Sequence, residues 1–394
     1  MTELWVQEQN GRKEIALIEN GKLIEYYEES NNQARKEGNI YIGIVKDIIK
    51  GMQSAFVDIG IEKNSFIHLK DLLPKIDETK EKVNENIKIS DVVTTGQKVL
   101  IQVKKDSNEK KGARVSTHIN LPSKYIALMP NSDIITVSQK IEDKKEQERL
   151  KKLVRKYLSE GNGAIIRTSA QNKEDEVIKD IKEIEAKWNK IIQTSINPKM
   201  NKPQLLYKSE DILERMIIDL AGKNIDRIIV NTEDMLKEIK KVKEHNVEYK
   251  NVEVELKKDE NIFELYDIEK QIEKMQNRKI WLKCGGFITI DKTEALTAID
   301  VNTGKYTGSK ELEQTVYKVN KEATIEIAKQ LRLRDIGGII IIDYIDMKEK
   351  DNKESIEKLL KEELKKDRSK TQVEGFTKLD LMELTRKHIC RHKD

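Results

Sequence analysis

Two short apolar runs near the C-terminal end, each followed at once by an aspartate, constrain the fold most strongly. Leu296–Ile299 precedes Asp300, and Ile339–Ile342 precedes Asp343. Short runs with this apolar and β-branched content are typical of buried strands. The sequence therefore predicts two strands, each of which ends at a carboxylate.

The segment between these strands has the pattern of an amphipathic helix. Gly308-Ser309 is typical of a helix start and Gly337-Gly338 of a helix end. A strand–helix–strand order favours parallel strands, whose C-terminal ends meet at one edge of a sheet. We therefore expect Asp300 and Asp343 to lie close together. The apolar residues that recur at steps of three or four are Leu312, Val316, Val319, Ala323, Ile327 and Leu331.

A carboxylate pair with Asn302 two residues after the first member suits a hard cation. Mg²⁺ prefers oxygen ligands, keeps several waters, and takes one or two carboxylates together with substrate phosphate. A single aspartate at a strand end is often a cap or a turn former, and this alternative stays open for either residue alone. The pair predicts a Mg²⁺ site held by Asp300 and Asp343. Strand alternation would point Asp346 to the opposite face from Asp343.

Three segments of the chain resemble the catalytic region of the ribonuclease E/G family. They are Thr293–Thr303, Arg332–Met347 and Glu383–Lys387, within a resemblance that runs from Met1 to about Arg386. It implies a Mg²⁺-dependent endoribonuclease that hydrolyses phosphodiester bonds in single-stranded RNA. Asp300 and Asp343 match the metal-binding aspartates, with Asn302 beside them as a catalytic residue. Asp346 does not match a metal ligand of the family.

The resemblance also implies a preference for RNA with a 5′-monophosphate, and roles in rRNA and tRNA processing and mRNA decay. Arg167 and Thr168, at the end of a short predicted strand, match the pocket that senses this phosphate, and Lys370 matches a second sensor cation that is often arginine. An arginine fork beside a hydroxyl can hold a phosphate through charge-assisted hydrogen bonds. The Arg-Thr pair alone is a weak signal, since such pairs are ordinarily solvated.

Between residues 39 and 117 the pattern changes to short strands punctuated by glycine. This spacing predicts a small OB-type barrel, a fold that binds single strands by stacking bases on aromatic side chains beside a basic rim. Phe56 and Phe66 are the candidate stacking residues, and an isolated Phe in a strand otherwise belongs to a core. The predicted strands are Ile40–Val45, Ser54–Ile59, Ser65–His68, Lys98–Val103 and Ala113–Thr117.

The resemblance adds three lysines to the RNA-binding surface. Lys105 and Lys111 match lysines that contact RNA phosphate in the family. Lys140 matches a basic position near the active site that is arginine in the family. A lysine is a point charge, whereas an arginine presents a planar fork, so we expect weaker phosphate positioning at Lys140.

The first 30 residues alternate apolar and polar side chains in three runs separated by Asn10-Gly11 and Asn20-Gly21. Asn-Gly between such runs is the strongest short hairpin signal, so we predict a three-stranded meander. We expect a later helix–strand–helix segment to pack against this meander. The domain would then be discontinuous in sequence. The resemblance implies a ribonuclease-H-like fold for it. The later elements are Asp211–Ala221, Asp226–Val230 and Glu233–Glu244.

The sequence thus predicts an α+β protein of several domains. They are a discontinuous ribonuclease-H-like scaffold (1–37 and 206–278), an OB-type RNA-binding barrel (38–118), a 5′-phosphate sensor region (119–205) and a catalytic domain (279–394), for which the resemblance implies a deoxyribonuclease-I-like fold. Further predicted elements are a loop at Pro74–Thr95 and helices at Ile141–Tyr157, Leu265–Arg278, Glu354–Lys366 and Leu379–Lys387.

Composition limits which other classes of protein the chain can belong to. A net charge of +4 does not by itself indicate a polyanion binder. No apolar run approaches the roughly 20 residues of a membrane span, and the N-terminus lacks a basic and apolar leader, so we expect a cytoplasmic protein. Cys284 and Cys390 lack Cys-x-x-Cys spacing, which argues against a disulfide framework and against a zinc site within one chain.

The family continues into a Cys-Pro-x-Cys element that shares zinc between two chains, where this sequence reads His388-Ile-Cys-Arg-His-Lys-Asp. We predict no zinc site there, and we leave open whether the chain forms a homo-oligomer, as a dimer or a tetramer. The main alternative function is a non-catalytic or assembly-deficient RNA-binding protein of the same family. A deoxyribonuclease is a weaker alternative, because the aromatic platform favours single-stranded RNA.

Overall fold

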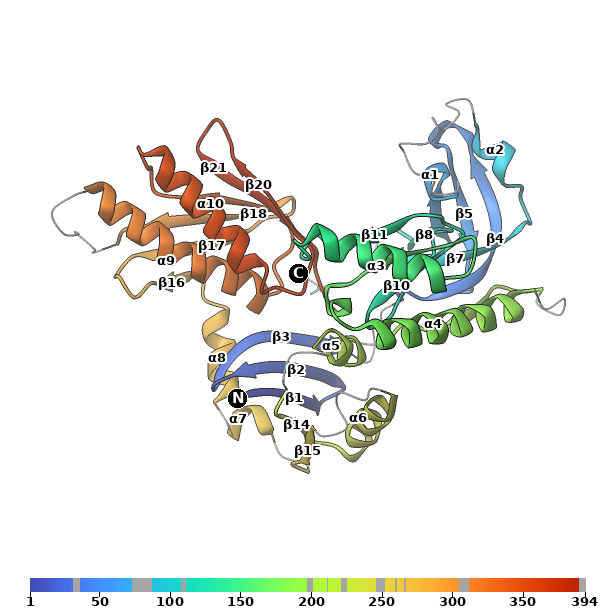
Figure 1. The fold of residues 1–394 in the computed structure, drawn as a ribbon, viewed down its shortest axis with the longest axis horizontal. Helices are drawn as coiled ribbons and strands as arrows, with labels where there is room; N and C mark the ends of the chain where they lie inside the picture. The colour runs from blue at the N-terminus through green and yellow to red at the C-terminus, as the bar shows by residue number, and fades with distance from the viewer. Residues whose placement is uncertain are drawn as a thin grey trace. The chain divides into compact units, whose positions relative to one another are not determined.

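The computed structural model (Figure 1) describes residues 1–30, 36–72, 87–107, 111–196, 201–210, 212–220, 225–245, 252–258, 261–265, 267–304 and 312–389. The chain forms two compact units. The first consists of Met1–Gln33 and Lys223–Asp394, and the second of Ala34–Gly222. In the part of the chain described, none of the helices has the length and apolar character needed to cross a membrane.

The first unit contains a five-stranded sheet in the order β15-β14-β1-β2-β3. The predicted meander is confirmed, because β1 (Thr2–Gln9), β2 (Arg12–Glu19) and β3 (Lys22–Ser30) pair in antiparallel fashion. Both Asn-Gly turns have positive φ at each residue, the conformation that tight hairpins need. β14 (Arg227–Val230) pairs in parallel with β1, and β15 (Glu253–Leu256) with β14.

Helices flank this sheet. α6 (Glu233–His245) contacts β14 and β15, α7 (Ile262–Leu265) contacts β1, and α8 (Ile268–Met275) contacts β3. The predicted helix Leu265–Arg278 is therefore shorter and corresponds to α8, whereas α7 is a separate turn of helix that ends at Leu265. Asp267, with a φ of 55°, lies in the left-handed region and separates them.

A second sheet in the first unit has six strands in the order β16-β17-β18-β19-β21-β20. β18 and β19 pair in parallel and are joined through α9 (Leu312–Leu333), so the predicted strand–helix–strand unit is confirmed. The predicted lysine-rich helix is α10 (Lys350–Leu364). The strands are β16 (Lys279–Trp281), β17 (Phe287–Lys292), β18 (Leu296–Asn302), β19 (Gly338–Asp343), β20 (Thr371–Phe376) and β21 (Leu381–Arg386).

The two faces of this sheet differ in what covers them. α9 and α10 pack on one face, where a single cluster includes Ile299 and Ile340 from the strands and Ile327 and Leu360 from the helices (Figure 1). Along β18 the burial alternates, so the residues between the buried ones point to the other face. We call this other side, which carries Asp300 and Asp343, the open face.

The predicted helix at Leu379–Lys387 is wrong, since Leu381–Arg386 is strand β21, paired with β19 and β20. Its burial alternates with period two, and Met382 and Leu384 enter the core while Glu383 is exposed. A short segment with leucine and charged residues fits a helix locally. Pairing with the distant strand β19 decides the structure instead.

The second unit contains the predicted five-stranded barrel. β4 (Ile40–Ile49), β5 (Ser54–Asp58), β6 (Ser65–His68), β8 (Arg114–Ser116) and β7 (Lys98–Lys105) follow one another, and β7 pairs back with β4 to close the ring. An outlying strand, β13 (Gln204–Tyr207), pairs with β4. Short turns of helix, η2 (Lys50–Met52), α1 (Leu69–Leu72) and α2 (Ile89–Val92), complete the barrel.

The predicted solvated loop Pro74–Thr95 is wrong in its last part. Residues 73–86 lie outside those described. Beyond them, Ile89 and Val93 are buried in the barrel core, on one helical turn. The abundance of charge in this window concealed two apolar residues at a spacing of four, which is a helical signal.

The remaining part of the second unit is a four-stranded sheet in the order β11-β12-β10-β9 with two helices. α3 (Lys144–Tyr157) confirms the predicted charged helix, and the stripe from Val177 to Ile191 on α4 (Glu174–Ser195) is buried. The strands are β9 (Leu121–Pro122), β10 (Ile126–Pro130), β11 (Ile135–Val137) and β12 (Asn162–Ile166). α5 (Ile212–Leu220) also falls within this unit's residues, so it belongs to a different unit from the meander it was expected to cover.

Buried ion pairs hold Arg386, the last residue of β21, in place. Arg386 donates to Asp367 and to Asp335, each at 2.7 Å, and none of the three side chains is more than 2% exposed. Asp335 also accepts from the backbone N–H of Ile389 at 3.0 Å. Charges this deeply buried are tolerated only while all partners are present.

Arg386→Met is expected to destabilise the protein by about 3–5 kcal/mol, because it leaves two buried carboxylates without their cation. Denaturant unfolding would show this as a lower transition midpoint. Lys179→Met is the matched control, since Lys179 pairs with Glu183 on the exposed surface of α4 and should change the midpoint little. Equal midpoints for wild type and Arg386→Met would contradict the importance of the cluster.

Candidate functional site

The structure brings the two predicted aspartates together. Asp300 and Asp343 are register partners on the adjacent parallel strands β18 and β19. Paired residues on neighbouring strands point to the same face, and the strands lie about 4.8 Å apart. Both aspartates are exposed on the open face. A parallel pair of strands thus places two carboxylates side by side at the end of a sheet.

Asn302 joins this pair through a direct contact. Its Nδ2 donates to Oδ2 of Asp300 at 2.5 Å. Asn302 is two residues beyond Asp300 on β18, so both side chains lie on one face. The amide therefore fixes the orientation of the Asp300 carboxylate.

The surroundings of Asp343 raise the pKa of its carboxyl group. Partial burial is the largest cause, followed by the negative charges of Asp300 and Asp346. β19 ends at Asp343, so strand alternation does not extend to Asp346, which lies near enough to act on Asp343. The expectation that alternation points Asp346 away from Asp343 therefore loses its basis. Three carboxylates contribute negative charge here.

This chemistry fits a hard divalent cation. Two carboxylates in register repel each other, and a cation between them would remove that penalty. Among the described residues no group of three or more His, Cys, Asp or Glu side chains forms a closed metal cage. Mg²⁺ does not require one, because it completes its shell with water and substrate phosphate.

Two buried polar residues of α9 hold the segment that follows Asp343. Asn320 donates to the carbonyl of Ile345 at 2.8 Å and accepts from its N–H at 3.1 Å. Thr324 shares a 2.9 Å hydrogen bond with the hydroxyl of Tyr344. Sequence reasoning missed both, although their spacing of four residues beside an apolar helical stripe was a usable signal. They fix the backbone that carries Asp343 into the turn.

The predicted aromatic residues of the barrel form a row with two cations. Phe56 pairs with Phe66, Phe66 with Arg114, and Arg114 with Lys105, across four adjacent strands. The two rings meet edge to face with centroids 6.2 Å apart. Both phenylalanines are only partly buried, whereas their strand neighbours Val57 and Ile67 belong to the core. The row therefore lies on the outer surface of the barrel.

Lys111 lies near this row because the next residue, Gly112, packs closely against Asn64. A Cβ on the next residue, Gly112, would come within 1.9 Å of the Asn64 carbonyl oxygen. Only glycine allows this close approach, which holds the exposed Lys111 beside the strand that carries Phe66.

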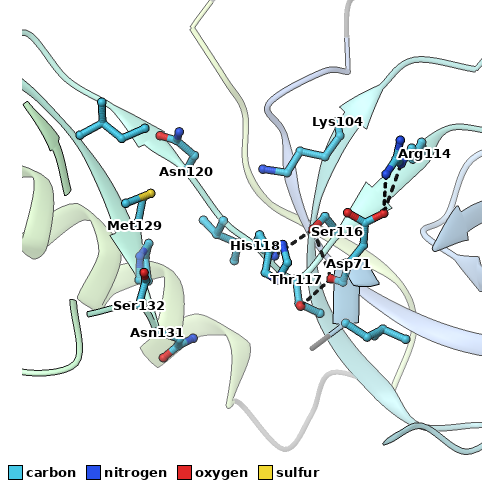
Figure 2. Close-up of a pocket in the computed structure, with 14 residues that line it drawn as sticks. Asp71, Lys104, Arg114, Ser116, Thr117, His118, Asn120, Met129, Asn131 and Ser132 are labelled. Carbon is cyan, nitrogen blue, oxygen red and sulfur yellow. Dashed lines mark hydrogen bonds and ion pairs between the residues drawn. The ribbon is translucent and has the colours of Figure 1, made fainter. Parts of the chain in front are cut away.

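A cavity of about 580 Å³ opens beside the row. Figure 2 shows Lys104, Arg114 and His118 on its barrel side, and Asn120 and Asn131 across from them. Asp71 accepts from Arg114 at 2.8 Å and so fixes the guanidinium at the rim. The volume lies within the range of ligand pockets, about 300–1,000 Å³. Its lining mixes apolar side chains, such as Leu72 and Met129, with several hydrogen-bond donors.

The predicted phosphate-sensing pair lies at the end of β12. Arg167 donates to the carbonyl of Ser123 at 2.7 Å, and Thr168 shares a 3.0 Å hydrogen bond with the Ser138 hydroxyl. Ser138 also accepts from the backbone N–H of Lys140 at 3.4 Å, so Lys140 starts close to Thr168. The structure thus gathers Arg167, Thr168 and Lys140 in the second unit.

Asp180 is the buried anchor of this region, and sequence reasoning missed it. It accepts from the Ser123 hydroxyl and from the N–H of Tyr125 at 2.9 Å. Burial raises the pKa of Asp180 despite these hydrogen bonds. Lys370 is exposed and belongs to the first unit, next to β20. Its part in phosphate sensing therefore stays a prediction.

Asp343→Asn is expected to stabilise the chain at neutral pH in a chelating buffer, because it removes a carboxylate whose pKa is raised. A raised folded pKa means that the carboxylate costs stability once it ionises, so the gain should vanish as the pH falls below that pKa. Thermal unfolding at neutral and acidic pH would measure this. A variant less stable than wild type at neutral pH would contradict the assigned repulsion.

Comparisons with known proteins agree with the resemblance seen in the sequence. Residues 120–389 match the model of the ribonuclease E/G family. Ribonuclease G of Escherichia coli (strain K12) is 39% identical over 392 residues, which cover 98% of this chain and 79% of the relative. Ribonuclease G of Salmonella typhimurium (strain SL1344) is 38% identical over the same coverage. Ribonuclease E of Nostoc sp. (strain PCC 7120) is 34% identical over 357 residues, 89% of this chain and 51% of the relative.

Proposed function

The chain belongs to the ribonuclease E/G family and is an endoribonuclease, and we propose that it hydrolyses single-stranded RNA with Mg²⁺ held by Asp300 and Asp343. The observation that carries this proposal is the register pairing of these two aspartates on the open face. Asn302 supports it by fixing one carboxylate. The chemistry is hydrolysis of a phosphodiester bond.

The catalytic residues act on the scissile phosphate through position and charge. A bound Mg²⁺ would supply an activated water and neutralise charge on the phosphate. Asp300 and Asp343 would hold the cation, and Asn302 would keep the Asp300 carboxylate in its binding orientation. The turn anchored by Asn320 keeps Asp343 in register with its partner. With two carboxylates in register, we propose one cation at each site.

The barrel supplies the binding surface for the RNA strand. Bases would stack on Phe56 and Phe66, while Arg114, Lys105 and Lys111 meet phosphates. Paired and stacked bases of a duplex cannot separate onto these rings, so the surface favours single strands. The cavity beside Arg114, with its mixed apolar and polar lining, gives room for a further nucleotide.

Arg167 and Thr168 form the proposed pocket for a 5′-monophosphate. The Ser123 carbonyl orients the guanidinium, and Ser138 orients the Thr168 hydroxyl. Lys140 begins beside the same hydroxyl pair and adds a point charge. Lys370 of the first unit is the second proposed cation.

The finer assignments of fold and biology are proposals as well. We propose a ribonuclease-H-like scaffold, an OB-type barrel, a sensor region and a deoxyribonuclease-I-like catalytic domain with the boundaries given above. Roles in rRNA and tRNA processing and in mRNA decay follow the resemblance. A cytoplasmic location is proposed from the composition, and whether the chain forms a homo-oligomer is left open. The non-catalytic alternative is disfavoured, because the carboxylate pair is retained in register.

Asp300→Asn is expected to lower Mg²⁺-dependent cleavage of a short AU-rich RNA with a 5′-monophosphate by at least about a hundredfold, because a neutral amide binds the cation poorly. Binding of the uncut RNA should stay within a few-fold of wild type, since the barrel is untouched. Gel-resolved cleavage and fluorescence anisotropy would measure the two effects.

Asp351→Asn is the matched control for this variant. Asp351 is an exposed carboxylate in the first turn of α10 and should leave cleavage unchanged. Full activity in both Asp300→Asn and Asp343→Asn would refute the metal site. Loss of RNA binding together with cleavage would instead indicate a structural role.

Arg167→Ala is expected to reduce the ratio of cleavage rates between 5′-monophosphate and 5′-hydroxyl RNA by about tenfold, because it removes charge-assisted hydrogen bonds to the phosphate. Cleavage of the 5′-hydroxyl substrate should change little. Arg12→Ala, at an exposed pair with Glu28, is the control. An unchanged ratio in Arg167→Ala would place the sensor elsewhere.

A further inference from the structure

An exposed tryptophan lies on the open face, on the same sheet as Asp300 and Asp343. Trp281 is 59% exposed, whereas Trp5 and Trp188 are 2% and 6% exposed. It lies on β16, an edge strand of this sheet. Exposed apolar groups at a sheet edge favour association with another molecule when they form a patch. The fold does not require this ring for its core.

Phe287 and Lys279 complete an aromatic and cationic patch with Trp281. The two rings meet edge to face with centroids 5.3 Å apart. The Lys279 ammonium lies 3.6 Å from the centroid of the Phe287 ring and 4.2 Å from that of Trp281. These distances are well inside the range of cation–π attraction. The patch is therefore a preformed arrangement of two rings and one charge.

The pairing of strands β16, β17 and β18 places this patch near the two aspartates. Trp281 pairs with Phe287, and Phe287 pairs with Asn302. In the neighbouring row, Thr289 pairs with Asp300. All these residues share the open face, and two strand spacings separate Trp281 from Asn302, which is about 10 Å. The patch thus adjoins the proposed catalytic site.

We propose that Trp281, Phe287 and Lys279 form a base-stacking subsite for the RNA nucleotide next to the scissile phosphate. Aromatic rings stack on any base, and a nearby ammonium meets the backbone phosphate. The chemistry repeats that of the barrel row, where Phe56 and Phe66 align with cations. Each unit then holds its own section of the strand. This inference rests on the proposed function.

The position of the subsite defines its role in the reaction. The barrel row lies in the second unit and governs overall binding of the strand, whereas this patch adjoins the carboxylates. A base held at the patch would fix the phosphate beside Asp300 and Asp343. Trp281 is therefore expected to affect kcat/KM for RNA, and to do so on substrates of any base composition.

Tryptophan fluorescence gives a direct test, because Trp5 and Trp188 are buried. In the Asp300→Asn protein, which keeps the RNA uncut, saturating single-stranded RNA should quench emission and protect it from iodide. Adding Trp281→Ala should abolish both effects. Adding Phe66→Ala instead should weaken binding but leave the quenching in place at saturation.

Kinetics give the second measurement. In an otherwise wild-type chain, Trp281→Ala should lower kcat/KM for single-stranded RNA about tenfold, and Trp281→Phe should restore most of it. Tyr157→Ala is the matched control, since Tyr157 is also an exposed aromatic ring with a lysine above it at 5.1 Å. It should leave kcat/KM unchanged. Equal thermal midpoints would show that each variant folds.

Three outcomes would overturn the subsite. Unchanged kcat/KM in Trp281→Ala, without RNA quenching in the cleavage-deficient protein, would remove it while the proposed function stands. Dissociation of oligomers by Trp281→Ala in light scattering, without RNA protection, would make the patch an interface between copies. A wild-type chain that neither binds nor cuts RNA would refute both proposals. RNA quenching through Trp281 without cleavage by the wild type would support the subsite and refute the hydrolysis alone.

Discussion

The parallel pairing of β18 with β19 is the constraint on which the proposed metal site depends. Because α9 returns the chain to the same end of the sheet, two strand ends that are distant in sequence place Asp300 and Asp343 in one row. Partial burial, and after it the negative charges of Asp300 and Asp346, raise the pKa of Asp343, so holding the two aspartates in one row is costly. The fold holds them together by burying the opposite face of the same strands.

One face of the sheet packs against helices and contributes stability, and the other face carries the proposed site residues. Ile299 and Ile342 flank the aspartates in sequence yet point into the helix-covered core. That core restrains the strands, and the hydrogen bonds from Asn320 and Thr324 restrain the turn after Asp343. The open face carries the polar and charged groups that a core could not tolerate without partners, together with some apolar side chains such as the half-exposed Ile339. Side chains for substrate binding can thus vary on this face without altering the packing beneath them.

Prediction from the sequence succeeded where a local sequence pattern is combined with a general rule of chain connectivity. The Asn-Gly turns predicted the meander, and the strand–helix–strand order predicted both the parallel pair and the proximity of the two aspartates. It failed at Leu381–Arg386, where pairing with β19 overrides a segment that fits a helix. It also passed over Trp281, because its alignment with Asn302 arises from the register of two hairpin pairs. Register across several strands is set by tertiary packing, and no single segment encodes it.

The pairing of β1 with β14 has a consequence for the order in which the protein can fold during synthesis. The second unit, Ala34–Gly222, is complete in the nascent chain before β14 has been made. Until then the N-terminal hairpins expose the edge of β1 to which β14 will bind. A folded insert shortens the effective loop that this late pairing must close, which lowers its entropic cost. The second unit thus serves the first as a folded spacer during translation.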